Sequence, residues 1–376
     1  MFGPLIARRA LLGTALAAPF IRPSFAQGSD PYVIGTLFPM SGPNAEYGKL
    51  FTDGVQLAID HMRAENLLRR PVRVQSEDSQ ALPQQAVIGM TKLINVDRAS
   101  WVLTGFTSVS KAVAPVADRA RTITVNGGAV GPDLERLSPY FWNVIPLAHL
   151  ETRAIFPFLI RRDLKRVALI YVDDPFGDAI LQLMQREFPA AGGTVAGVFS
   201  IPRAQQNFGA VAARVRQARP DAVYIASFGA QQPQIIKGLR DNGVRQPLIS
   251  YSGINIGSVL SLPEAEGLIF TSQKFDFSAG DALTRRFAAD FRARHGADPA
   301  IYNTNYYNGT RLFALLAAEL ERENKPVNGD TLRETLLRIR EFDLVGGKAS
   351  FDEHGSMTAA IQINEIRGGR MTPIAG

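Results

Sequence analysis

The clearest structural signal in the chain is the segment RVALIYVDDPFG, residues 166–177. Its first seven residues, 166–172, form an apolar run rich in residues that favour β-structure, which predicts a buried strand. The acidic pair Asp173-Asp174 and Pro175 follow, and a helical pattern then continues from about Phe176 to Phe188. A buried strand that leads directly into a helix is typical of a βαβ unit in a parallel sheet.

The same alternation extends outward from this segment in both directions. Helical patterns connect the successive strands, with 282–294 and 302–323 as the last two. The expected strands are 32–38, 72–74, 101–103, 122–125, 221–227, 247–251, 267–271, 344–351 and 359–366. The restart at residue 166 predicts an α/β fold with two doubly wound parallel-sheet lobes. In such folds the ligand cleft lies between the lobes, at the carboxyl ends of the strands.

Composition excludes several classes of function. The 376 residues include no cysteine, so a disulfide framework, a thiolate zinc site and a cysteine nucleophile are excluded. The formal net charge is +6, but residues 1–26 contain three arginines and no acid, which leaves +3 for the remainder. That remainder has no clustered basic segment, so we expect no nucleic-acid partner.

The first 26 residues have the pattern of a signal peptide. Arg8-Arg9 precedes an apolar run over 10–18, and Ser24-Phe25-Ala26 provides small residues where a signal peptidase cleaves. The apolar run is too short to span a bilayer. We therefore expect a mature, soluble chain from Gln27 in the periplasm. The arginine pair resembles a twin-arginine signal but follows Ala7 instead of the usual serine, so the export route stays open.

The motif search favours binding over catalysis. The four histidines lack metal-ligand spacing, and there is no P-loop, no strand-linked GxGxxG and no GxSxG elbow. The acidic pairs Glu77-Asp78 and Asp173-Asp174 lie at strand ends, where helix capping explains them at least as well as catalysis. We therefore expect no enzyme activity, no metal and no cofactor.

Candidate binding residues lie at strand–helix junctions. The segment GFTSVS, residues 105–110, places hydroxyls and backbone N–H groups at an expected helix start, an arrangement that suits a carboxylate. Helix capping by Ser108 or Ser110 is an equal alternative. Aromatic residues occupy comparable junctions and are interpreted as pocket walls: Tyr47, Phe176, Phe228 and Tyr251.

Together these segments resemble one family, the type I periplasmic binding proteins of the leucine/isoleucine/valine-binding branch, which serve ABC transporters. The resemblance covers nearly the whole mature chain. The matching segments are GTLFPMSGP at 35–43, EDSQ at 77–80, Gly105 with its hydroxyl loop, APVA at 114–117, YVDDPFG at 171–177 and FDEHG at 351–355.

The resemblance implies three crossovers between the lobes, near Leu147, Lys274 and Gly346. Lobe one would comprise 30–147 plus 275–345, and lobe two 148–274 plus 346–376. It also implies a ligand site, with an acid for a ligand ammonium expected between Tyr251 and Asn255. The implied binding residues are Tyr47, Thr107 or Ser108, Gly128, Ala129, Val130, Phe176, Phe228, Tyr251 and Ser252.

Departures from the family pattern indicate an altered ligand. Val130 replaces a usual threonine, Phe176 and Phe228 replace common tyrosines, and residues 250–255 contain no acid. A desolvated ammonium without a counter-ion is unfavourable by several kcal/mol. We therefore expect a monomeric binding protein that delivers a small carboxylate without an α-ammonium to a membrane permease.

Three alternatives remain open. The ligand is an amino acid if Glu77, Asp173 or Asp174 reaches its ammonium. The chain is instead a ligand-sensing subunit if a receptor kinase accompanies it. It is an enzyme of doubly wound fold if a substrate panel reveals turnover.

Overall fold

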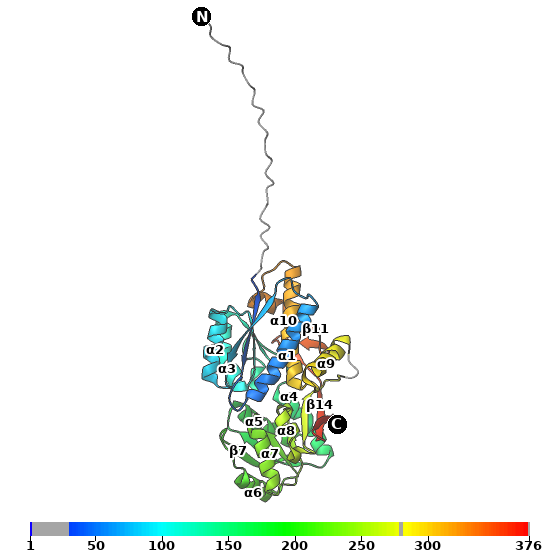
Figure 1. Ribbon diagram of the computed structural model, residues 1–376. Coiled ribbons are helices and arrows are strands. Elements are labelled where there is room, and N and C mark those ends of the chain that lie inside the picture. Colours follow the sequence, from blue (N-terminus) through cyan, green and yellow to red (C-terminus); the bar gives the residue numbers. More distant parts are fainter. Residues whose placement is uncertain (2–29, 278–280, 375–376) are drawn as a thin grey trace.

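The computed structural model describes Met1, residues 30–277 and residues 281–374, and its helices and strands form two lobes (Figure 1). The first lobe contains a five-stranded sheet in the order β2-β1-β3-β4-β5, and every pair in it is parallel. Its strands are β1 (Tyr32–Phe38), β2 (Val72–Asp78), β3 (Trp101–Thr104), β4 (Ile123–Asn126) and β5 (Phe141–Asn143). All residues of β1, β3, β4 and β5 are buried, as in a sheet covered on both faces.

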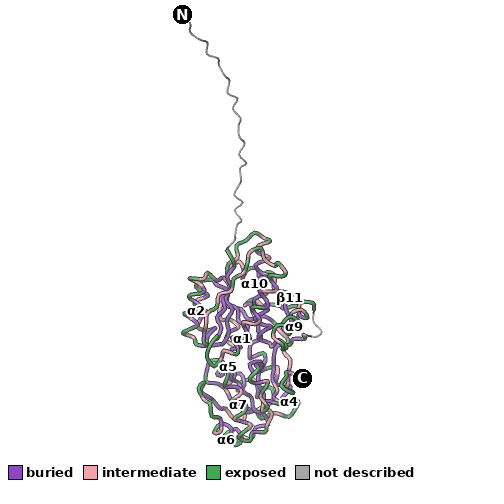
Figure 2. Tube along the Cα trace, in the orientation of Figure 1, coloured by how far each residue is buried: buried purple, intermediate pink, exposed green. Residues whose placement is uncertain are grey.

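Amphipathic helices cover this sheet. In α1 (Ala45–Ala64) the buried side chains of Phe51, Val55, Ala58 and Met62 recur every three or four residues and form one apolar face. That helix packs closely against α10 (Ile301–Arg322). The other helices of the lobe are α2 (Pro83–Asn95), α3 (Thr107–Ala120), α9 (Ala282–His295) and α11 (Gly329–Ile339). Figure 2 shows buried segments through the centre of each lobe and exposed residues on the outer helices.

The second lobe contains a seven-stranded sheet in the order β15-β14-β10-β9-β8-β6-β7. Five neighbouring strands are parallel, while β14 and β15 join the edge in antiparallel orientation. The strands are β6 (Arg166–Val172), β7 (Thr194–Ile201), β8 (Ala222–Ala226), β9 (Leu248–Ser250), β10 (Ile269–Gln273), β14 (Ile361–Arg367) and β15 (Arg370–Pro373). The α/β fold with two parallel-sheet lobes, predicted from the sequence, is confirmed.

Helices surround the second sheet in the same way. The longer ones are α4 (Ala148–Arg161), α5 (Pro175–Ala190), α6 (Gly209–Ala218) and α7 (Gln231–Asp241). Short turns complete the chain: η1 (Pro132–Leu134), η2 (Ser252–Ile254), α8 (Gly257–Leu260) and η3 (Pro263–Ala265). Asp174 caps α5 by accepting the Gly177 N–H at 2.9 Å, which agrees with the capping interpretation of its acidic pair.

The last crossover between the two lobes lies later in the chain than the position near Gly346 that the family resemblance implied. Residues 344–351 do not form one strand, because Gly346 and Gly347 have φ values of 98° and 105° and turn the chain back. The result is an antiparallel sheet of β11 (Glu341–Leu344), β12 (Gly347–Phe351) and β13 (Met357–Thr358). The chain therefore enters the second sheet at β14, and not near Gly346.

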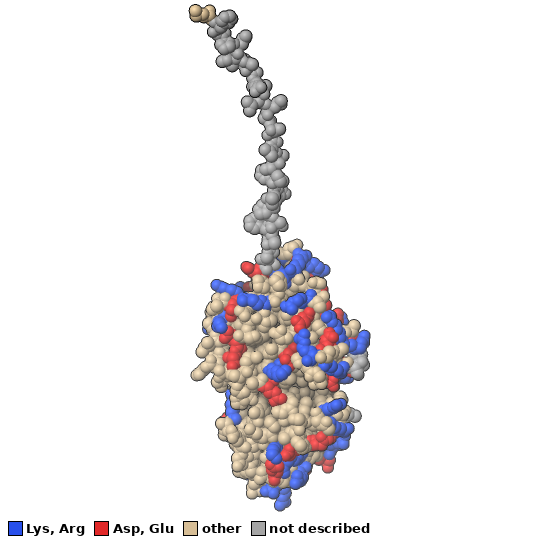
Figure 3. Space-filling view, in the orientation of Figure 1, with Lys and Arg blue, Asp and Glu red and all other residues tan. Residues whose placement is uncertain are grey.

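The surface carries both signs of charge. Lysine and arginine are interspersed with aspartate and glutamate over the face shown in Figure 3. Within the described ranges, no helix combines the length and the apolar character that crossing a membrane requires. The expected signal peptide at 1–26 lies outside the described residues apart from Met1.

Candidate ligand-binding site

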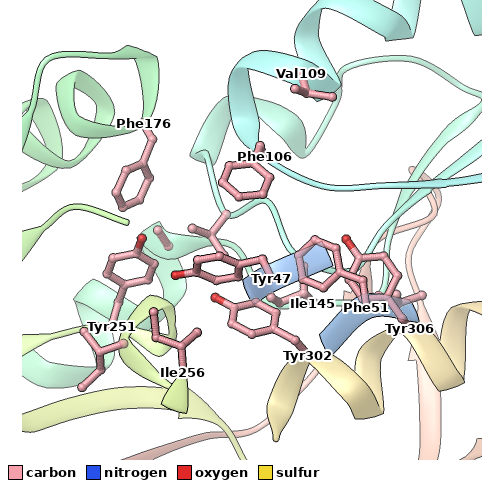
Figure 4. Close-up of a cluster of buried hydrophobic side chains, with 14 of the residues drawn as sticks. Tyr47, Phe51, Phe106, Val109, Ile145, Phe176, Tyr251, Ile256, Tyr302 and Tyr306 are labelled. Atoms are coloured by element: carbon pink, nitrogen blue, oxygen red, sulfur yellow. The ribbon is translucent and has the colours of Figure 1, made fainter. Parts of the chain in front are cut away.

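A small cavity lies between the lobes, where the strands of both sheets end (Figure 4). Its first-lobe wall consists of Tyr47, Phe106, Thr107, Gly128, Ala129, Val130 and Tyr302. Its second-lobe wall consists of Phe176, Phe228 and Tyr251. The enclosed volume is about 20 Å³, roughly the space of one water molecule. The two walls are therefore almost in contact.

Polar groups of the first-lobe wall gather at the start of α3. That helix begins at Thr107, and its N-cap position is Phe106, which makes no side-chain capping bond. The alternative that Ser108 or Ser110 caps this helix is therefore wrong. Thr107 Oγ1 accepts the Gly131 N–H at 3.1 Å, so its own O–H remains available to a ligand. The unpaired N–H groups of a first helical turn favour an anion.

The backbone of Phe106 is in an unusual conformation. Its φ of 67° and ψ of 129° lie in a region that bulky side chains rarely adopt. This conformation turns the chain sharply between β3 and α3, and the Phe106 ring lines the cavity. Strained backbone of this kind is concentrated at functional sites, because only the surrounding structure can hold it.

In the loop after β4, unlike at the start of α3, backbone N–H groups are used within the loop itself. The N–H groups of Gly128 and Ala129 both donate to Asn126 Oδ1, at 3.1 and 2.6 Å. Asn126 also donates to the Ala129 carbonyl at 2.7 Å, which fixes the loop as a turn. Val130 completes the turn with an apolar side chain, so this part of the wall offers a rigid surface with no side-chain hydroxyl.

The second-lobe wall is aromatic. The Phe176 ring lies 4.9 Å from the Tyr251 ring and 6.3 Å from the Phe228 ring, between ring centroids. Phe228 also meets Phe106 of the first lobe edge-on at 5.7 Å. The Tyr251 hydroxyl donates to the Ser227 carbonyl at 2.9 Å. This wall therefore presents ring faces and edges to the cavity.

Tyr47 connects the lobes across the cavity. Its hydroxyl donates to the Gly253 carbonyl at 2.7 Å and accepts the Gly229 N–H at 3.4 Å. Beside it, the Glu46 carboxylate accepts the Ser258 N–H and hydroxyl at 3.0 and 2.6 Å. These contacts join the start of α1 to two loops of the second lobe, so the lobes are closed on each other.

Behind the second-lobe wall lies a buried acid, Glu151 on α4. Its side chain is fully inaccessible, and its two oxygens accept the Ser252 N–H and the Ser252 hydroxyl, each at 2.8 Å. Burial raises the pKa of this carboxyl to about 8, although the bonds from Ser252 oppose the shift. The carboxyl group is therefore largely neutral at pH 7.

The structure brings together eight of the ten residues expected at the site: Tyr47, Thr107, Gly128, Ala129, Val130, Phe176, Phe228 and Tyr251. Ser108 instead faces an outer crevice with Gln80 and Arg203. Ser252 lies behind the wall against Glu151. Phe106 and Tyr302 also line the cavity but were not expected from the sequence. Whether these residues bind a ligand stays a prediction.

None of the three acids that the sequence offered for a ligand ammonium lines the cavity. Glu77 pairs with Lys92, and Asp173 is exposed to solvent. Asp174 pairs with Arg203 at 2.8 Å in addition to capping α5. Across residues 30–277 and 281–374, no three His, Asp or Glu side chains gather in a group that could hold a metal ion.

Fold and cavity together define a two-lobed binding protein. The chain belongs to the periplasmic binding protein family, whose model matches residues 31–370. This membership confirms the resemblance identified from the sequence. The family and the relatives below are binding proteins and not enzymes, which also confirms the expectation of a non-enzymatic chain.

Curated relatives are found in the leucine/isoleucine/valine-binding branch. The chain is 23% identical to a Leu/Ile/Val-binding protein of Rhizobium johnstonii, over 87% of this chain and 89% of the relative. It is 22% identical to the leucine-specific-binding protein of Salmonella typhimurium, over 91% and 93%.

Solved structures share the fold at lower identity. A leucine-binding protein of Thermotoga maritima superimposes with a TM-score of 0.83 at 19% identity, covering 92% of this chain and 98% of that one. A solute-binding protein of R. palustris, solved in complex with benzoate, gives 0.81 at 18% identity, covering 92% and 95%.

Proposed function

We propose that this chain is the exported, monomeric binding component of an ABC transporter of the branched-chain amino-acid type, and that it delivers its ligand to the membrane permease. The ligand is a small carboxylate with a flat or apolar body and no α-ammonium group. Lobe closure around the ligand is the expected mode of binding.

One observation carries the ligand class: no side chain lining the cavity is an acid or a base other than tyrosine. An ammonium enclosed by these walls would meet aromatic rings and backbone, without the counter-ion that its desolvation requires. A carboxylate, by contrast, meets the first turn of α3 and the free O–H of Thr107. A flat body suits the aromatic second-lobe wall.

The relatives support the assignment to solute-binding proteins, but they differ in the ligands for which they are named or with which they were solved. The curated relatives above are named for leucine, isoleucine and valine. Other structural neighbours from Rhodopseudomonas palustris were solved with 3,4-dihydroxybenzoic acid and with 4-hydroxybenzoate, at TM-scores of 0.80. The uncharged walls of this cavity favour the second group.

Ligand entry requires the walls to separate. A volume of about 20 Å³ holds no aromatic or branched acid, so Tyr47 must release Gly253 and Gly229 before a ligand enters. Closure would then re-form around the ligand. The outer crevice beside Ser108, lined by residues of both lobes, is the natural entry route.

Competition calorimetry with leucine and its deaminated keto-acid analogue tests the ligand class. We expect the keto acid to bind the mature protein more tightly, because it retains the carboxylate and the branched body but lacks the ammonium. Benzoate serves as the flat carboxylate in the same series. Tighter binding of leucine would contradict the proposed ligand class while leaving the binding-protein assignment intact.

A further inference from the structure

The outer crevice beside Ser108 is a second space between the lobes, next to the ligand-binding cavity. Its volume is about 270 Å³, against about 20 Å³ for the cavity. Phe106 of the first lobe and Phe228 of the second line both spaces, and their rings meet edge-on at 5.7 Å. These two rings therefore form the partition between the cavity and the crevice. Because they belong to different lobes, separation of the lobes parts them and joins the two spaces.

Arg203 gives the crevice a positive charge. Among the described residues that line the crevice, Arg203 is the one charged residue, and the others are apolar or neutral polar residues. Its guanidinium carbon lies 5.8 Å from the centroid of the Phe228 ring, so the cation lies beside the partition. The side chain is 41% exposed and is therefore reachable by a solute in the crevice. A crevice lined by charge of one sign attracts ligands of the opposite sign.

Buried polar groups hold Arg203 in place. Its Nη2 donates to Asp174 at 2.8 Å, and the Asp174 side chain is only 2% exposed. The buried Gln231 donates through Nε2 to the Pro202 carbonyl at 2.8 Å and to the Arg203 carbonyl at 3.3 Å. These bonds fix both the guanidinium and the loop that carries it. A group held in this way loses less conformational freedom when a ligand binds.

The pair with Asp174 leaves most of the guanidinium unused. An arginine has five N–H donors in a planar fork that matches a carboxylate. In the part of the chain that the structure describes, Asp174 is the one group that accepts a hydrogen bond from this guanidinium, and it does so through Nη2. Because Asp174 is nearly inaccessible, the exposed member of the pair is the cation. The crevice therefore offers a carboxylate-binding group that the cavity lacks.

We propose that Arg203 is a specificity-determining residue that binds a second carboxylate of the ligand, so that the preferred ligands are elongated dicarboxylates. One carboxylate meets Thr107 and the first turn of α3, and the body lies between the aromatic walls. The second carboxylate extends past Phe106 and Phe228 into the crevice, where the guanidinium binds it by charge-assisted hydrogen bonds. This inference rests on the proposed function and narrows its ligand class.

The test is calorimetry at pH 7 with pairs of acids that differ only in the second carboxylate. Terephthalate and benzoate form the flat pair, and adipate and hexanoate form the flexible pair. Wild type should bind at least one dicarboxylate about fivefold more tightly than its monoacid, because a bond to a half-exposed guanidinium is intermediate in strength between a surface ion pair and a buried one. Arg203→Gln should reduce this preference to about twofold or less. Arg203→Lys keeps the charge but loses the planar fork, so it should retain part of the preference.

Arg214→Gln is the matched control. Arg214 is another exposed arginine of the second lobe that lies over a phenylalanine ring, that of Phe199 at 4.9 Å, but it lines neither the cavity nor the crevice. Its replacement should leave the preference for the dicarboxylate unchanged. The readout is the ratio of two affinities within one variant, because a merely structural effect of unpairing Asp174 would weaken both acids alike.

The outcomes distinguish this inference from the proposed function. If wild type binds both monoacids at least as tightly as the dicarboxylates, the inference is overturned while the proposed function stands. A dicarboxylate preference that persists in Arg203→Gln overturns it as well, because the second carboxylate then binds elsewhere. If leucine binds wild type more tightly than every acid of the series, or if no acid binds, the proposed ligand class and this inference both fail.

Discussion

The first-lobe wall of the cavity differs from the second-lobe wall in the source of its polar groups. In the first lobe they come from the start of a helix, from Thr107 and from a turn held by Asn126, all short and rigid. In the second lobe they lie behind a layer of rings, in the Glu151–Ser252 pair. Under the proposed function, the first wall would bind the carboxylate and the second would discriminate between ligand bodies.

The largest effect is expected on stability, from removing a ring of the second-lobe wall, because these rings are also part of the hydrophobic core. Phe176 is 1% exposed and contacts Tyr251 and Phe228. We expect Phe176→Ala to lower the free energy of unfolding by about 3–5 kcal/mol, measured by urea denaturation. Phe228→Ala is the comparison, since Phe228 is only partly buried and should lose clearly less. A Phe176→Ala loss as small as that expected for Phe228→Ala would contradict a core role for the Phe176 ring.

Many of the residues that line the cavity could be predicted from the sequence, for a physical reason. The carboxyl ends of parallel strands meet at one edge, so residues directly after strands, such as Thr107 and Phe176, were expected to converge. Gly128 was expected only because the family resemblance implied it. Tyr302 was not expected, because α10 is buried on nearly every face and its aromatic residues resemble ordinary core. Its position in the cavity depends on how α10 packs against α1, which local pattern does not specify.

Glu151 was missed although the sequence carries a signal for it. The buried residues of α4 include Glu151, Ile155, Phe158 and Leu159, spaced as one helical face. An acid on an otherwise apolar face indicates a buried polar group. The family resemblance implied an acid between Tyr251 and Asn255, a segment that contains none. The structure instead brings it to that loop from another element.

The buried Glu151 carboxyl should make the stability of the protein depend on pH. Its pKa is about 8 in the folded protein and near 4.5 in the unfolded chain, so between these values the folded state binds one more proton. The free energy of unfolding should therefore rise by about 1.4 kcal/mol for each unit of falling pH within that window. The comparison is between wild type and Glu151→Gln, by urea denaturation at pH 8 and pH 6. Identical pH dependence in the two proteins would contradict a neutral buried Glu151.

The smallest expected effect is a loss of ligand affinity when a hydroxyl is removed from the first-lobe wall. Thr107→Ala removes the hydroxyl at the start of α3, and we expect ligand affinity to fall about tenfold, because a hydrogen bond to a charged group contributes about 1.5–3 kcal/mol. Adding Ser108→Ala should change little, since Ser108 faces the outer crevice. Calorimetry with the acid that binds most tightly in the competition series measures both. A larger loss from Ser108 than from Thr107 would shift the carboxylate site outward.

The bonds of Tyr47 have a consequence for how this protein diverges. Two of its three partners across the lobes, the Gly253 carbonyl and the Gly229 N–H, belong to the main chain, and the third is the side-chain oxygen of Gln232 at 3.5 Å. Replacing Phe176, Phe228 or Tyr251 therefore alters the ligand's surroundings without deleting an atom that Tyr47 bonds. Under the proposed function, substitutions that change the preferred ligand can then accumulate in the second-lobe wall while the closing contact persists.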